Sequence, residues 1–232
     1  LALNKIWFDL GKEINPHVRA FPEMHSLLPI PHPFIAPGGR FRELYYWDSY
    51  WILKGLLVSG MVDTAQGMIE NLLWLVNTLG FVPNGARCYY KNRSQPPLLT
   101  LIVKDFFDRT QNITFLKYAL PTLDKEWSYW MDGPTTVRIT VPGRTTRYTM
   151  NHYWAYTDEP RPEGYAEDVT LAQSVPEEQR AQLYHNIATA ASSGWDFSTK
   201  WFADRTNFNT IATARVVPVE LNTIFHKVEQ TL

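Results

Sequence analysis

An aspartate between two aromatic residues is the side chain in this sequence best suited to acid catalysis. Asp196 follows Gly194 and lies between Trp195 and Phe197. Such a carboxyl can be desolvated by its neighbours, which raises its pKa, whereas nearby arginines would lower it. A protonated carboxylic acid is what the cleavage of a glycosidic bond requires. The alternative is an aspartate that only accepts backbone hydrogen bonds at the end of a helix.

A second group of candidate residues lies between positions 37 and 50, in the stretch PGGRFRELYYWDSY. Two glycines allow the backbone to turn tightly there and to approach a ligand. Arg40, Trp47 and Asp48 then follow within nine residues. Arginine only donates hydrogen bonds and a carboxylate only accepts them, so together they suit sugar hydroxyl groups. A surface loop with an ordinary Arg40–Asp48 ion pair explains the same residues equally well.

Three further segments place polar side chains beside prolines or turns. The candidates in them are Asn84, Arg93, Ser94, Gln95, Arg161, Pro162 and Glu163. An amide both donates and accepts hydrogen bonds, and prolines stiffen the backbone that carries a neighbouring donor. Each segment also has an ordinary interpretation, namely a turn, a polar lead-in to a helix, and a loop salt bridge.

Helices are expected to position these residues, because apolar residues recur at the spacing of one helical face. The expected helices span residues 63–79, 97–109, 113–131 and about 177–192, with a last one beginning near Val219. Asp63 with Gln66 and Ser174 with Glu177 resemble capping pairs. Gly80 is expected to end the first helix, and Pro121 to break or restart the third.

Two other features complete the expected architecture. Val137, Ile139 and Val141 alternate with polar residues before a Pro-Gly turn, which predicts a β-hairpin whose second strand covers residues 147–154. Long loops favour a scaffold that presents a site on one face. They are expected at residues 28–46, 81–96, 156–168 and 194–218.

Composition excludes several classes of protein. The 232 residues carry 22 basic and 23 acidic side chains, so no charge excess favours binding to nucleic acid or to an anionic membrane. No run is apolar for long enough to span a bilayer. The single cysteine, Cys88, excludes an internal disulfide and is expected to be a buried apolar residue. Aromatic residues make up 14% of the chain, which fits a large aromatic core or stacking against sugars.

The stretch at residues 37–50 resembles the signature of the trehalase family, glycoside hydrolase family 37. Further segments that match in family order lie at residues 82–97, 160–168, 193–201 and 217–222, so the resemblance covers nearly the whole chain. It implies an inverting enzyme that cleaves α,α-trehalose to two glucose molecules without a metal or a cofactor. Asp196 would be its general acid. The residues that would line the sugar subsites are Arg40, Trp47, Asp48, Asn84, Arg93, Ser94, Gln95, Arg161, Pro162, Glu163 and Gly194.

The resemblance also implies an all-α fold, an (α/α)6 toroidal barrel to which the β-hairpin is a small insertion. Residues 1–232 would form a single, incomplete catalytic domain, because the family's Gln-Trp-Asp signature and its distal glutamate, the general base, do not occur in the chain. The chain alone is therefore expected to be inactive. Ser192 and Gly164 depart from the glutamate and serine expected of many relatives.

Two rival functions remain open at this point: a non-catalytic sugar-binding protein on the same scaffold, and a different helical-barrel glycosidase. The resemblance is to animal-type secreted or membrane-associated trehalases, which implies an extracellular or cell-surface location. Two glycosylation sequons, at Asn92 and Asn112, fit that location. The only partner expected is the substrate, trehalose, with no nucleic acid and no membrane contact from this segment.

Overall fold

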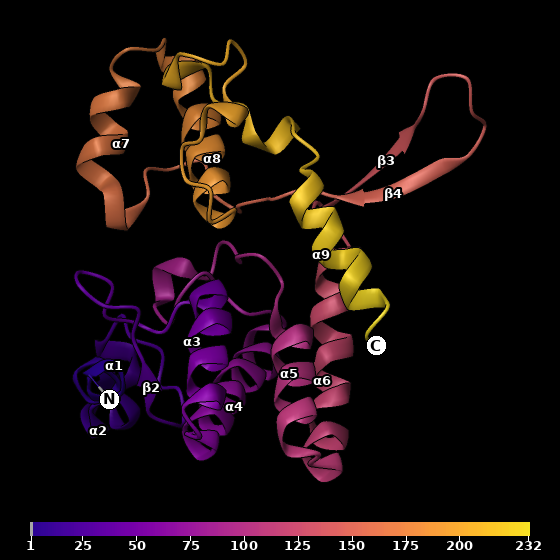
Figure 1. Cartoon of the computed structure of the whole chain (residues 1–232). Coiled ribbons are helices and arrows are strands. Elements are labelled where there is room, and N and C mark those ends of the chain that lie inside the picture. Colours follow the sequence, from indigo (N-terminus) through magenta and orange to yellow (C-terminus); the bar gives the residue numbers. More distant parts are fainter. Residues whose placement is uncertain (1) are drawn as a thin grey trace. The chain divides into compact units, whose positions relative to one another are not determined.

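The computed structural model describes the backbone of residues 2–232 and the side chains of residues 4–232. It is mostly helical, as the sequence predicts (Figure 1). The helices are α1 Ala2–Leu10, α2 Pro16–Ala20, α3 Tyr46–Val58, α4 Val62–Leu79, α5 Leu99–Thr110, α6 Ile113–Met131, α7 Tyr165–Ala172, α8 Glu177–Ser192 and α9 Val219–Glu229. The strands are β1 Gly11–Lys12, β2 Phe34–Ile35, β3 Thr136–Thr140 and β4 Arg147–Asn151.

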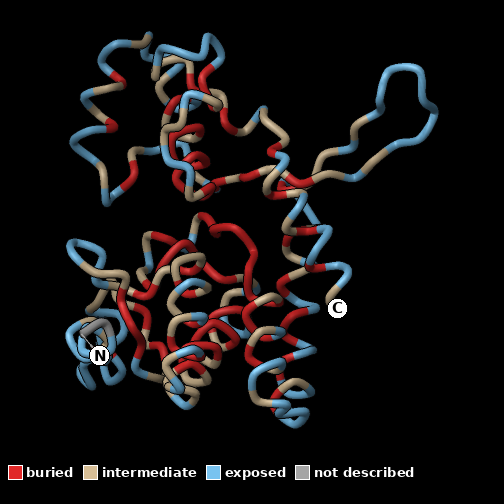
Figure 2. The backbone as a smooth tube through the Cα atoms, in the orientation of Figure 1, coloured by how far each residue is buried: buried red, intermediate tan, exposed pale blue. Residues whose placement is uncertain are grey.

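Two compact units make up the described chain. The first contains the residues up to Tyr129 together with His226–Leu232, and the second contains Trp130–Phe225. In the first unit α3, α4 and α5 pack against one another, and their facing residues are buried (Figure 2). The short strands β1 and β2 pair antiparallel in the same unit. No helix among residues 2–232 has the length and apolar character needed to cross a membrane.

Helix α4 shows how the apolar pattern produces this core. Most of the apolar stripe expected from the sequence is fully buried, including Ala65, Met68 and Leu72, whereas Leu79 at its end is half-buried. Gly80 ends the helix in the left-handed conformation, with φ of 89°, and its N–H donates to the carbonyl of Val76 at 2.8 Å. A glycine adopts this conformation without the steric penalty of a Cβ atom. The stop predicted at Gly80 is therefore confirmed.

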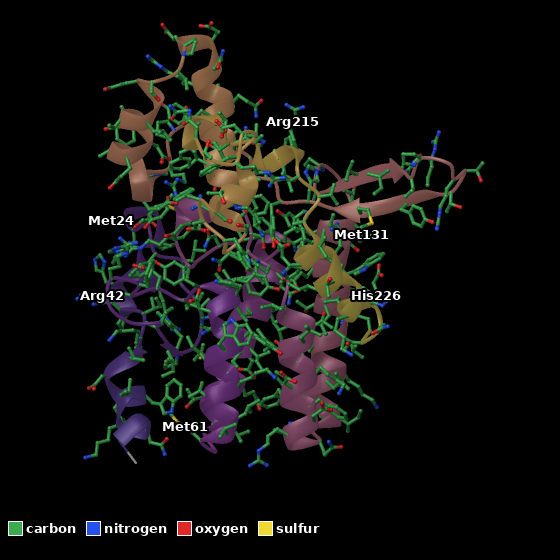
Figure 3. All side chains as sticks on the ribbon, turned by 45° about the horizontal axis from the view of Figure 1, so that its top comes forward. Met24, Arg42, Met61, Met131, Arg215 and His226 are labelled. Atoms are coloured by element: carbon green, nitrogen blue, oxygen red, sulfur yellow. The ribbon has the colours of Figure 1, made fainter. Side chains whose placement is uncertain are left out.

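Both predicted capping pairs are wrong. Helix α4 follows Met61, labelled in Figure 3, without any side-chain cap, and Gln66 instead donates to Glu70 in the next turn at 2.8 Å. The hydroxyl of Ser174 donates backwards to the carbonyl of Leu171 at 2.5 Å, so it closes the end of α7 rather than the start of α8. The residue before α8 is Pro176, which has no side-chain oxygen to cap the helix.

Several element boundaries also differ from expectation. Helix α6 runs through Pro121 as one helix, so this proline does not break it. Helix α3 was not among the expected helices, and the first half of α7 lies where a loop was expected. The buried face of α3 includes Tyr46 and Ser49, and its exposed side carries Trp51, which obscures the apolar pattern. Acidic residues in the first turn of α7 favour that helix through its dipole rather than through hydrophobic spacing.

In the second unit, the hairpin forms as predicted. Strands β3 and β4 pair antiparallel from Thr136 opposite Asn151 to Thr140 opposite Arg147. The second strand ends at Asn151, three residues earlier than expected. Helix α8 supplies much of this unit's core through a run of mostly small buried residues that begins at Asn186. Large rings such as Trp201 are also buried there.

The prediction for Cys88 is wrong, because its side chain is exposed. It lies on a short 3-10 turn, Cys88–Tyr90, whose first backbone N–H donates to the carbonyl of Ser26 at 2.7 Å. Aromatic residues were expected either to form a core or to be available for stacking against sugars, and both kinds of position occur. Trp201 and Tyr46 belong to the core, whereas the side chains of Trp51 and Trp195 are 58% and 52% exposed.

Candidate functional site

In the first unit, the candidate residues surround the beginning of α3. Trp47 and Asp48 lie in its first turn, where backbone N–H groups have no partner within the helix. The N–H of Trp47 donates to Oε1 of Gln95 at 3.1 Å, and the N–H of Tyr46 donates to the carbonyl of Asn84 at 3.2 Å. The loop between α4 and α5 therefore caps α3 and brings two predicted segments together.

Arg93 is held within that loop by Asn84. Its Nε donates to Oδ1 of Asn84 at 2.9 Å, and its guanidinium lies 5.2 Å from the centre of the Tyr90 ring. The side chain of Arg93 is only 1% exposed. Ser94 donates its hydroxyl proton to the carbonyl of Val82 at 2.6 Å, so this side chain anchors the loop while its oxygen can still accept.

Arg40 and Asp48 are not paired with each other. Among the ion pairs of residues 4–232, none joins these two side chains. The alternative interpretation, in which Arg40 and Asp48 form an ordinary ion pair, is therefore wrong. The exposed guanidinium of Arg40 lies over the ring of Phe41 at 4.9 Å. Partial burial raises the pKa of the Asp48 carboxyl above its usual value. Desolvation penalises the charged form of a carboxyl, so Asp48 keeps its proton to a higher pH than an exposed aspartate does.

In the second unit, Arg161 is clamped by Asp168. Its Nε and Nη2 donate to the two carboxylate oxygens of Asp168 at 2.9 and 2.6 Å, and its backbone N–H donates to the same group at 3.0 Å. Burial acts to lower the pKa of Arg161, but these bonds and the charge of Asp168 raise it overall. Pro162 and Glu163 lie on the exposed 3-10 turn Pro162–Gly164, directly after Arg161.

The segment that carries Asp196 follows α8 and is shaped by several contacts. Gly194 adopts a φ of 69°, and the N–H of Trp195 donates to the hydroxyl of Ser193 at 2.9 Å. The indole N–H of Trp201 donates to the carbonyl of Trp195 at 2.9 Å. Asp196 itself lies on the exposed part of this segment.

Phe197, directly after Asp196, joins this segment to Arg161. The Arg161 guanidinium lies 5.0 Å from the centre of the Phe197 ring. The centre of the Phe208 ring also lies 5.0 Å from the centre of the Phe197 ring. Phe197 has a φ of 57°, which is a strained conformation for a bulky residue. These two contacts pack against the ring of Phe197, and they therefore affect the backbone conformation directly after Asp196.

Sequence reasoning missed one partner of a candidate residue and one buried pair beside the candidate residues. Asp168 was part of a family segment but had no assigned role, although a buried acid seven residues after Arg161 could have suggested one. The pair formed by Tyr46 and Glu126 had no local signal, because the two residues are 80 positions apart.

Two further observations describe the second unit and the chain as a whole. A cavity of about 830 Å³ lies beside α8 and residues 203–215, with His185, Asn209 and Arg215 in its lining. None of the predicted site residues lines it. Among the residues that the structure describes, no group of His, Cys, Asp and Glu could hold a metal ion.

Comparison with known proteins identifies the class to which this helical chain belongs. The family model described as Trehalase matches residues 1–232, so the chain is a member of the trehalase family. It is 44% identical to the trehalase of Bombyx mori, over 97% of this chain and 39% of that protein. It is 43% identical to the trehalase of Homo sapiens, over 99% of this chain and 40% of that protein.

A solved structure shows the same relationship. The neutral trehalase Nth1 from Saccharomyces cerevisiae superimposes with a TM-score of 0.68 at 25% identity, over 95% of this chain and 45% of that one. The chain therefore spans about two fifths of the length of the curated relatives that it matches.

Proposed function

We propose that this chain provides the general acid and most of the sugar-binding residues of an enzyme that hydrolyses α,α-trehalose to two glucose molecules. The observation that carries the proposal is the match of the whole chain to the trehalase family, with 42–44% identity to curated trehalases. The arrangement of the candidate residues supports it, since both Arg93 and Arg161 are fixed in place before any ligand binds. Preorganised donors suit a sugar, whose hydroxyl groups need partners at defined positions.

In this mechanism Asp196 protonates the glycosidic oxygen while a water molecule attacks the anomeric carbon from the opposite side. The attacking water requires a second carboxylate as general base, roughly 6.5–9.5 Å from the acid in an inverting enzyme. No residue of this chain matches the glutamate that is the base in the family, so we propose that the base lies in the part of the relatives' length that this chain does not span. Attack from the side opposite the leaving group inverts the anomeric configuration.

The binding roles follow from the hydrogen-bonding groups that each side chain presents. Arg40, Arg93 and Arg161 would donate to sugar hydroxyls, and Asp48 and Glu163 would accept from them. Trp47 would pack its ring on the apolar face of a sugar. The remaining subsite residues, Asn84, Ser94, Gln95, Pro162 and Gly194, shape the backbone around these groups.

The same proposal includes the fold of the complete protein. Paired helices such as α3 with α4 and α7 with α8 are the repeating unit of an (α/α)6 barrel. We propose that residues 1–232 contribute part of one such catalytic domain. We also propose a secreted or cell-surface glycoprotein, which the exposed sequon at Asn112 supports.

The decisive experiment replaces Asp196 with asparagine in a protein of the relatives' full length. Asparagine keeps the shape of the side chain but cannot donate the acidic proton. We expect kcat/KM for trehalose to fall on the order of 10²–10⁴-fold. The loss for α-glucosyl fluoride should be much smaller, because fluoride departs with less protonation. Equal losses on both substrates would show that Asp196 is not the acid.

A further inference from the structure

Asp168 is a buried carboxylate that accepts hydrogen bonds from Arg161, and the described residues supply it with no other donor. It lies in the first turn of α7 and is 2% exposed. It accepts two side-chain bonds and one backbone bond from Arg161. This bidentate geometry fixes both the position and the plane of the guanidinium, because the fork of donors matches the two carboxylate oxygens.

The fixed guanidinium in turn contacts the ring of Phe197. The ring of Phe208 also contacts Phe197, and it stacks on Phe202 with the ring centres 5.4 Å apart. A left-handed phenylalanine costs about 1–3 kcal/mol and persists only where its surroundings enforce it. The contact between Arg161 and Phe197 is therefore part of what keeps the segment after Asp196 in its observed conformation.

We infer that Asp168 is a positioning residue for the acid step, acting on Asp196 through Arg161 and the ring of Phe197. This inference rests on the proposed role of Asp196 as general acid. It adds a residue that does not touch the substrate, and it assigns Arg161 a second task beside sugar binding. A small displacement of a catalytic group is sufficient to slow a reaction on the order of 10²-fold.

Gly164 provides an independent way to disturb the same contact. A Cβ atom at this position would lie 2.9 Å from Nη2 of Arg161 and 3.4 Å from its Cζ. The φ of Gly164 is −138°, so alanine can adopt the backbone conformation. Gly164→Ala therefore pushes the guanidinium while leaving the carboxylate of Asp168 and its charge intact.

The test uses the full-length protein and two substrates. Asp168→Asn keeps one acceptor but places an amide N–H₂ group against the donors of Arg161, so the guanidinium must move. We expect kcat/KM to fall at least about tenfold more for trehalose than for α-glucosyl fluoride, because only trehalose depends strongly on the acid. Gly164→Ala should also lower the ratio of kcat/KM for trehalose to kcat/KM for α-glucosyl fluoride. Glu167→Gln, an exposed neighbour on the same turn, should leave the ratio unchanged.

A purely structural role for Asp168 predicts equal losses on both substrates, and that result, or no loss, would overturn the inference. If Asp168→Asn fails to fold, Gly164→Ala still tests the inference, because the alanine variant removes no charged or hydrogen-bonding side chain. Asp196→Asn is measured in parallel. If it separates the two substrates and the Asp168 and Gly164 variants do not, the positioning role alone is wrong. If Asp196→Asn does not separate them, the acid assignment is wrong, and the inference is wrong with it.

Discussion

Glu126 is expected to make the stability of this chain depend on pH near neutrality. It lies on α6 with 3% of its surface exposed, and the hydroxyl of Tyr46 donates to its Oε1 at 2.5 Å. The same hydroxyl oxygen accepts from the backbone N–H of Leu99 at 2.9 Å. Burial raises the pKa of Glu126 from 4.5 to about 7, while the bond from Tyr46 acts in the opposite direction.

The size and sign of the effect follow from that pKa. Because the folded state binds the proton more tightly than the unfolded chain, the contribution of Glu126 to stability is greatest below pH 4.5. It is lost as the pH rises through about 7. The full difference corresponds to about 3 kcal/mol, and most of it falls between pH 5 and pH 8. This is a large fraction of the 5–15 kcal/mol that is typical of a folded protein, roughly a quarter.

Glu126→Gln isolates this contribution, because glutamine still accepts from Tyr46 but does not ionise. Urea unfolding of both proteins at pH 5 and pH 8 measures the difference in the free energy of unfolding. We expect the variant to gain about 2–3 kcal/mol relative to wild type between these two values of pH. Asp124→Asn, an exposed change on the same helix, should show no such gain. Parallel pH dependence in wild type and Glu126→Gln would refute the reasoning.

Other predictions concern the same network, the arginines, glycosylation and the isolated chain. Tyr46→Phe should lower the free energy of unfolding by about 2–4 kcal/mol, because two buried groups lose a partner, and urea unfolding will measure it. Arg93→Lys and Arg161→Lys in the full-length protein should each lower kcat/KM for trehalose on the order of 10²-fold, since lysine lacks the planar fork; near wild-type kinetics would contradict their binding role. Mass spectrometry of secreted protein should find a glycan on the exposed Asn112 and none on Asn92, whose Oδ1 accepts from Arg93 at 3.3 Å; a glycan on Asn92 in fully active protein would be incompatible with this placement. Residues 1–232 alone should release no glucose from trehalose, and activity comparable to the full-length protein would mean that a carboxylate within this chain is the base.

Local features were predictable from the sequence where one physical signal dominated. The apolar stripe of α4 and its stop at Gly80 are examples, as is the alternation that forms β3. The caps were wrong because the helices begin at other residues: α4 begins at Val62, so Asp63 lies inside its first turn, and α8 begins after Pro176 rather than after Ser174. Helix α3 was missed because its buried face mixes apolar residues with Ser49.

The candidate site was predictable only in part, and for a related reason. Arg93 and Asn84 are nine positions apart, so one family segment contains both partners of that hydrogen bond. The pair formed by Tyr46 and Glu126 joins two helices that are far apart in the chain, and no periodicity or turn signal indicates it. Such contacts are set by tertiary packing, which a local pattern does not encode.

The hairpin β3–β4 makes a two-chain form of this protein accessible. All residues from 141 to 147 are exposed, and Gly143 turns the chain with a φ of 80°. Cleavage after Arg144 would leave Asp48 and Arg93 on one polypeptide and Arg161 and Asp196 on the other. The β3–β4 ladder would remain to pair the two pieces without a covalent bond. In a full-length enzyme cut at this position, recovery of activity on mixing would report the association of the halves, which is the basis of a split-protein sensor.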